Sequence, residues 1–157
     1  MERRHFLATG SGATALALAA SAGLSPAQAQ AQTAAAWNKV AFDSKSLAEA
    51  AKAMGATSAP VESKDLVLQA PEIAENGSVV RVGAQSNIAG TTQLALVVEK
   101  NPNALAALFD IPAGTEANVS TNVKMGQSSN VYALAKAGDK FFYSVKEVKV
   151  TLGGCGG

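Results

Sequence analysis

The residue best suited to covalent chemistry in this chain is Cys155, the only cysteine in the sequence. It is flanked by two glycines on each side, Gly153 and Gly154 before it and Gly156 and Gly157 after it. Glycine has no side chain and adopts most backbone conformations, so we expect a flexible arm that exposes the thiol. Fully extended, five residues span about 17 Å at roughly 3.3–3.6 Å each. Such an arm would carry the thiol into a narrow cleft on another protein.

A frayed chain end is the alternative interpretation of this glycine-rich segment. Fraying does not explain why the sole cysteine of the sequence lies there. We therefore interpret residues 153–157 as a functional swinging arm.

The first 29 residues have the features of an export signal. The pair Arg3-Arg4 precedes Phe6-Leu7, a weakly apolar run over residues 8–24 and a small-x-small pattern that ends at Ala29. These features predict a twin-arginine signal peptide over residues 1–29, with cleavage after Ala29 or, alternatively, after Ala31. A membrane anchor is the alternative, but a spanning helix needs about 20 mostly apolar residues, and this run is rich in small and hydroxyl side chains. We expect a periplasmic protein with no membrane association.

Removal of residues 1–29 leaves a chain that lacks most catalytic groups. The only histidine, His5, is lost; two of the 13 basic residues and one of the 12 acidic residues are also lost, which leaves 11 of each. This balance argues against nucleic-acid binding. A single cysteine forms no internal disulfide, and Ser-His-Asp or Cys-His nucleophiles and His/Cys zinc sites are excluded. We expect no cofactor or metal, and a thiol on which other proteins act.

Two other classes of function remain open at this point. A secreted immunoglobulin-like binding module would dimerise through a Cys155–Cys155 disulfide. A thiol peroxidase would need a resolving cysteine or an activating base, and the sequence after residue 29 has one cysteine and no histidine.

The rest of the chain, residues 30–152, has the length of one ordinary domain. A short helix is predicted at about 44–54, because Ser46-Leu47-Ala48-Glu49 has the form of a capping box and Gly55 suits the carboxyl-terminal cap. Asp43 and Ser44 are alternative residues for the amino-terminal cap. Trp37, just before this helix, is expected to cover one end of the core, with a ligand-stacking role as the alternative.

After the helix, short segments with strand-like patterns are separated by turn residues such as Asn76-Gly77, Asn101-Pro102 and Gly138-Asp139. Seven such segments in about 100 residues predict an all-β fold, an immunoglobulin-like seven-stranded β-sandwich, with a small barrel as the alternative. They are Ser63–Gln69, Ser78–Ala84, Thr92–Val98, Ala104–Asp110, Ala117–Lys124, Ser129–Ala137 and Lys140–Leu152.

Two of these segments carry further information. Leu94–Val98 is apolar throughout, which favours a central strand. In the last segment the apolar residues change parity between Val145 and Val148, which predicts a bulge or bend near Lys146-Glu147. We expect this strand to be firmly packed up to Leu152 and to release the arm at Gly153.

The segment Val148–Gly157 resembles the carboxyl terminus of the SoxY family, the sulfur-carrier subunits of the periplasmic thiosulfate-oxidising (Sox) system. The resemblance extends to three internal segments, Ala70–Gly77, Glu99–Pro102 and Val123–Gln127. Together with the export signal, it covers essentially the whole chain.

The resemblance implies a carrier that is not itself an enzyme and that holds intermediates covalently on Cys155. It implies a stable heterodimer with SoxZ, a smaller β-sandwich protein. In the reactions it implies, the SoxAX cytochrome joins thiosulfate to the thiol, the SoxB hydrolase releases sulfate and leaves a persulfide, and in some organisms the molybdenum-containing SoxCD sulfur dehydrogenase oxidises the remaining sulfur.

Overall fold

The computed structural model describes residues 38–151. Two helices begin this range, α2 (Lys39–Phe42) and α3 (Leu47–Ala53). Nine strands follow within the same range: β1 (Val61–Glu62), β2 (Leu66–Gln69), β3 (Ile73–Ala74), β4 (Val80–Ser86), β5 (Thr91–Val98), β6 (Leu105–Asp110), β7 (Asn118–Val123), β8 (Ser129–Ala137) and β9 (Lys140–Val150). The predictions on the signal peptide, on Trp37 and on residues 152–157 lie outside the described residues.

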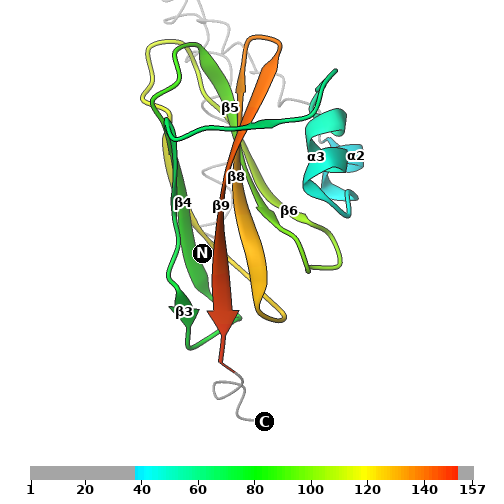
Figure 1. Cartoon of the computed structure of the whole chain (residues 1–157), viewed down its shortest axis with the longest axis vertical. Coiled ribbons are helices and arrows are strands. Elements are labelled where there is room, and N and C mark those ends of the chain that lie inside the picture. The colour runs from blue at the N-terminus through cyan, green and yellow to red at the C-terminus, as the bar shows by residue number, and fades with distance from the viewer. Residues whose placement is uncertain (1–37, 152–157) are drawn as a thin grey trace, which may run out of the picture. The chain divides into compact units, whose positions relative to one another are not determined.

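The strands form two sheets that face each other (Figure 1). The larger sheet has the order β1-β9-β8-β5-β6, with β3 also paired to β9, and the smaller has the order β2-β4-β7. All pairs are antiparallel except those of β1 and β3 with β9, which are parallel. The predicted all-β sandwich is confirmed.

All seven predicted strands are present, as β2 and β4 to β9. The prediction of seven was nevertheless incomplete, because β1 and β3 are additional strands among the described residues. Each has two residues, which is too short to show the alternation of apolar and polar side chains that marks a strand in sequence. Helix α2, a single turn, was not predicted either.

The main core lies between the two sheets. Its largest fully buried members are contributed by both layers, with Leu66, Val80 and Val82 from the smaller sheet and Leu94 and Leu96 from the larger. Because side chains alternate between the faces of a strand, one face of each sheet supplies this core.

A second core lies on the opposite face of the larger sheet, where the helices pack. Ala41, Ala50 and Ala51 of the helices meet Val97 of β5 and Leu134 of β8, and all five are fully buried. In Figure 1 both helices lie beside the larger sheet. The uniformly apolar Leu94–Val98 is thereby explained, because both faces of β5 are covered.

Helix α3 begins at Leu47, after the predicted capping residue Ser46 and three residues later than the predicted start at about 44. The Ser46 hydroxyl accepts a hydrogen bond from the Glu49 amide (3.2 Å), while the Glu49 carboxylate accepts one from the Lys45 amide (2.7 Å). The carboxylate thus reaches one residue further back than in the usual capping box. At the other end Gly55 has φ +100°, which confirms its predicted role after the helix.

The bulge predicted in β9 near Lys146-Glu147 was wrong. The pairing of β9 with β8 runs without a shift from Ala137↔Lys140 to Ser129↔Val148. The apolar residues change parity because the covering layer changes: Phe141 packs in the helix-side core, whereas Val148 packs between the sheets. A regular strand shows the same change of apolar parity as a bulged strand when its two faces are covered at different points along its length.

Candidate functional site at the end of strand β9

The end of β9 is held by backbone hydrogen bonds up to the last described residue. Beyond its pairing with β8, this end pairs in parallel with β3, with Ile73 opposite Lys149. The Lys149 amide donates to the Glu72 carbonyl (2.9 Å), and the Thr151 amide donates to the Ala74 carbonyl (3.1 Å). Thr151 is four residues before Cys155, so the predicted arm follows directly from a paired strand (Figure 1).

A serine side chain continues the ladder on the other side of β9. β8 begins only at Ser129, and the Ser128 hydroxyl accepts a hydrogen bond from the Val150 amide (2.9 Å) and donates to the Val150 carbonyl (3.5 Å). A part-buried amide would otherwise lose its partner here, at a cost of about 1–3 kcal/mol. Ser128 was not predicted as part of this end of β9, since a serine before a strand has no distinctive signal in the sequence.

Gly77 allows the turn before β4 to lie against this end of β9. A Cβ atom at this position would lie 2.5 Å from the Met125 carbonyl oxygen and 2.8 Å from Cγ1 of Val150. The Met125 amide also donates to the Gly77 carbonyl (2.7 Å), which fixes the close approach. Glycine is therefore required here for lack of space, in addition to its suitability for a turn.

Three turns that are distant in sequence meet at this end of the sandwich. The Gly77 turn contacts Met125 and Val150, as described, and the Asn101 side chain links the next two turns by donating to the Lys124 carbonyl (2.7 Å). These turns contain the three internal segments of the sequence resemblance, and their convergence was not predicted from the sequence. We call residues 70–79, 99–102, 123–128 and 149–151 the arm-root surface.

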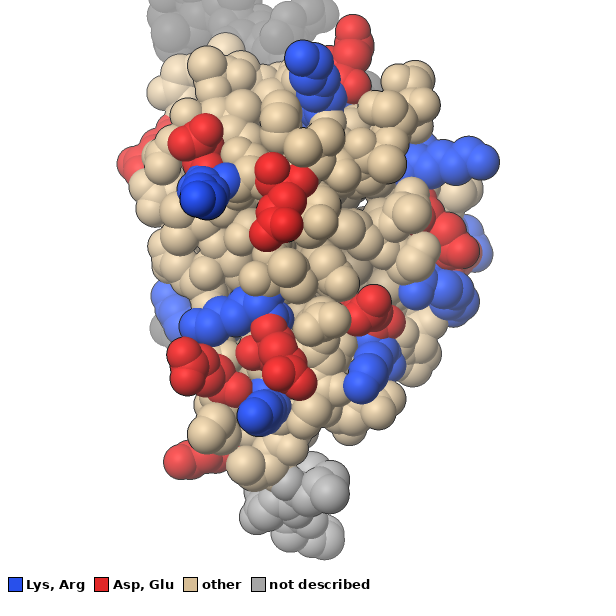
Figure 2. Space-filling view, in the orientation of Figure 1, with Lys and Arg blue, Asp and Glu red and all other residues tan. Residues whose placement is uncertain are grey.

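Charges of both signs lie on the arm-root surface. Its exposed charged residues are Glu72, Glu75, Glu99, Lys100, Lys124 and Lys149. Among residues 38–151 the single ion pair within 4 Å is Lys39–Asp43 on α2, so none of these six is paired. Figure 2 likewise shows acidic and basic side chains interspersed on the face in view. This surface therefore supplies no strong positive field to a nearby thiol.

The predicted site residues themselves, Cys155 with Gly153, Gly154, Gly156 and Gly157, lie outside the described residues. The structure describes the end of β9, which precedes them in the sequence. Their roles as covalent attachment point and flexible arm stay predictions.

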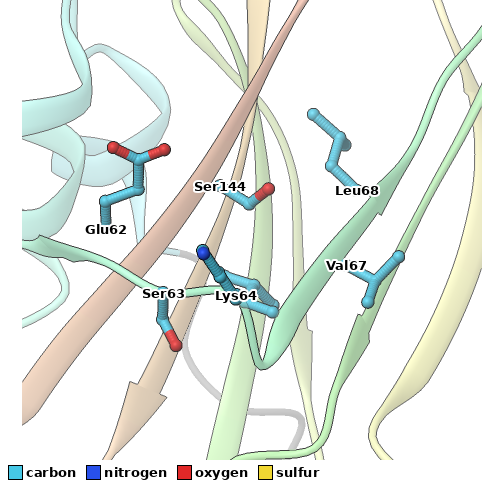
Figure 3. Close-up of a pocket in the computed structure, with 7 residues that line it drawn as sticks. Glu62, Ser63, Lys64, Val67, Leu68 and Ser144 are labelled. Carbon is cyan, nitrogen blue, oxygen red and sulfur yellow. The ribbon is translucent and has the colours of Figure 1, made fainter.

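A separate hollow of about 590 Å³ lies at the β1–β2 edge, lined by Glu62, Ser63, Lys64, Leu66, Val67, Leu68 and Ser144 (Figure 3). Ser144 is seven residues before Thr151, or about 23 Å along the strand. The hollow offers two hydroxyl groups, but residues 38–151 include no histidine to activate them. We assign it no catalytic role. The described part of the chain also has no cluster of metal-binding side chains and no helix able to span a membrane.

A tyrosine pair lies on the helix-side face of β8 and β9. The rings of Tyr132 and Tyr143 are 6.0 Å apart, and the Tyr132 hydroxyl donates to the Glu99 carboxylate at 3.5 Å. Burial, and secondarily the charge of Glu99, raises the pKa of Tyr132 above its usual value. This hydroxyl is therefore a neutral hydrogen-bond donor at physiological pH.

Comparison with known proteins gives one strong result. The family model described as sulfur oxidation protein SoxY matches residues 50–155. The solved structure of the sulfur carrier protein SoxY from Chlorobium limicola f thiosulfatophilum is 35% identical, with a TM-score of 0.58, and the match covers 65% of this chain and 94% of that chain.

More remote structural matches carry no argument. One chain of a solved structure that describes T cell specificity and activation by the bacterial superantigen toxic shock syndrome toxin-1 is 14% identical with a TM-score of 0.40, over 55% of this chain and 99% of that chain. A Jonesia denitrificans lytic polysaccharide monooxygenase is 16% identical with a TM-score of 0.35, over 47% of this chain and 54% of that chain. No curated protein matches the sequence.

Proposed function

The chain belongs to the SoxY family of sulfur oxidation proteins, and from this premise we propose that it carries thiosulfate-derived sulfur covalently on Cys155. The observation that carries the proposal is the extent of the family match, which ends at residue 155 and so includes both the arm-root surface and the cysteine. The solved relative named a sulfur carrier protein, at 35% identity, supports the same role.

The proposed reactions depend on other enzymes, because the sequence provides no general base for the Cys155 thiol. In the first step the Cys155 thiolate and the outer sulfur of thiosulfate form an S–S bond, and two electrons pass to a haem-containing cytochrome. In the second step water cleaves the bond to the sulfonate group, which releases sulfate and leaves a persulfide on Cys155. The carrier supplies the attachment point, and separate enzymes supply the oxidant and the hydrolytic machinery, so the carrier itself is not an enzyme.

The charges on the arm-root surface support a carrier that only holds the intermediate while separate enzymes catalyse the reactions. A free cysteine has a pKa near 8.5, and the nearest described residues carry unpaired charges of both signs. The positive field that would favour the thiolate, and later the anionic thiosulfonate, must then come from the clefts of the receiving enzymes.

The proposed partners are those that the family implies. SoxZ forms a stable heterodimer with the chain, and SoxAX, SoxB and, where present, SoxCD contact it transiently. The twin-arginine motif Arg3-Arg4 takes the folded protein to the periplasm. Replacing both arginines by lysine is expected to retain the protein inside the cytoplasm, as measured by cell fractionation.

The proposal is tested by the intact mass of the periplasmic protein from cells grown on thiosulfate, before and after a thiol reductant. We expect reductant-labile additions of sulfur or of a thiosulfate group on the peptide that contains Cys155, and none in a Cys155→Ser strain. A plain thiol, or a simple disulfide dimer, in cells that are oxidising thiosulfate would contradict the carrier role and favour the binding-module alternative.

A further inference from the structure

The distance over which Cys155 can move limits where a receiving enzyme can lie. Cys155 is four residues after Thr151, and four steps along the chain at about 3.3–3.6 Å each span at most about 14 Å. Any cleft that takes the thiol must therefore approach the arm-root surface to within about 14 Å. Resting on the carrier function proposed above, we propose that Ile73 and Val79 on this surface form the docking contact for the enzymes that receive the arm.

Both side chains are apolar and exposed beside the end of β9. Ile73 and Val79 are each 58% exposed. Ile73 precedes the buried Ala74 in β3, and Val79 precedes the buried Val80 in β4. Because alternate side chains of a strand point to opposite faces, Ile73 points away from the core. Val79 lies in the turn just before β4, and its exposure shows that it faces solvent. β3 pairs with β9 in the larger sheet, and β4 belongs to the smaller, so Ile73 lies beside the end of β9 and Val79 lies on the turn that leads into the opposite sheet.

The surroundings of these residues indicate the kind of partner. The charged residues of the arm-root surface are of both signs and form no ion pairs, so they do not complement a partner surface of one sign. Two exposed β-branched side chains within reach of the thiol are complementary to apolar side chains at the mouth of a cleft. The occupant is therefore an enzyme whose cleft has an apolar rim, with the positive charge confined to its interior.

The test compares Ile73→Asp and Val79→Asp with a matched control. Val61 is also an exposed apolar side chain, at 61%, but it pairs with Phe142, nine residues before Thr151 and about 30 Å away along β9. The purified SoxAX cytochrome is the probe, and the measurement is kcat/KM for conjugation of thiosulfate to Cys155 on each variant. Alkylation of Cys155 by iodoacetamide, measured in parallel, reports on the thiol without an enzyme.

We expect Ile73→Asp and Val79→Asp each to lower kcat/KM about tenfold, the scale expected for losing the burial of one exposed aliphatic side chain. Val61→Asp is expected to match the wild type, and the alkylation rate and melting temperature of all variants to stay unchanged. Equal rates for the two arm-root variants and the control would overturn the docking contact while leaving the carrier function intact. Absence of conjugation on the wild-type chain would instead refute the carrier function, and the docking contact with it.

Discussion

Replacing Gly77 by alanine tests the packing at the end of β9. The added methyl group would lie 2.5 Å from the Met125 carbonyl oxygen and 2.8 Å from Val150 Cγ1, so the turn must move away from both. Overpacking of this kind costs about 1–3 kcal/mol, and the reduced freedom of the unfolded chain offsets about 0.4–1 kcal/mol of it. We expect a net loss of about 1–2 kcal/mol in the free energy of unfolding, or about 4–8 °C in melting temperature for a domain of this size.

The control for this variant is Gly126→Ala on the same arm-root surface. A Cβ atom at Gly126 has no neighbour within 4 Å, so its substitution should change the melting temperature little. Urea and thermal unfolding give the free energies, and hydrogen exchange of the Thr151 amide, which donates to Ala74, reports on the end of β9. Gly77→Ala should accelerate that exchange. If Gly77→Ala is as stable as Gly126→Ala and exchanges at the wild-type rate, the close contact is not what holds this turn against the strand.

Two further predictions concern single side chains. Ser128→Ala removes the hydroxyl partner of the Val150 amide and should lower the free energy of unfolding by about 1–3 kcal/mol; Ser120→Ala, at an exposed position of β7, should not, and equal urea midpoints would contradict the role of Ser128. Tyr132 has a raised pKa, first from burial and then from Glu99, so the folded state favours its protonated form. Its contribution to stability is therefore complete below about pH 10, the ordinary tyrosine pKa, and is lost as the pH rises further. Difference absorbance titration of wild type and Tyr132→Phe should place its midpoint above that value, and a midpoint at or below it would refute the assignment.

The regular part of the fold was predictable because its signals are local. The capping residues of α3 and the turn residues before and after each longer strand act over a few positions, and all seven predicted strands are present. β1 and β3 were missed because two residues show no period. Their strand conformation comes from pairing with Phe142-Tyr143 and Lys149-Val150 of β9, which are distant in sequence.

The error in β9 has a different origin. Reading apolar parity along a strand assumes that one face is covered throughout, and here Phe141 and Val148 are buried on opposite faces by different layers. Phe141 is buried because helices α2 and α3 lie on the far side of the larger sheet. No feature within residues 140–150 indicates that helices cover this face.

One part of the candidate site could be predicted from the sequence, and another part could not. Cys155 was predicted from residue type and neighbours alone, and this prediction lies outside the described residues. The arm-root surface was not, because Gly77, Asn101 and Met125 come together only through the folding of three separate turns. Gly77 was expected to serve a turn, but the lack of space beside Val150 appears only in three dimensions.

The pairing of β9 on both sides also has a mechanical consequence. β8 lies along one side of β9, and β1 and β3 lie along the other. A pull on the chain beyond Thr151 acts along the strand axis, so it loads the hydrogen bonds of these ladders in shear. An edge strand pulled sideways would instead lose its hydrogen bonds one at a time. In the proposed carrier role, the domain would therefore resist unfolding when the residues beyond Thr151 are pulled out of an enzyme cleft.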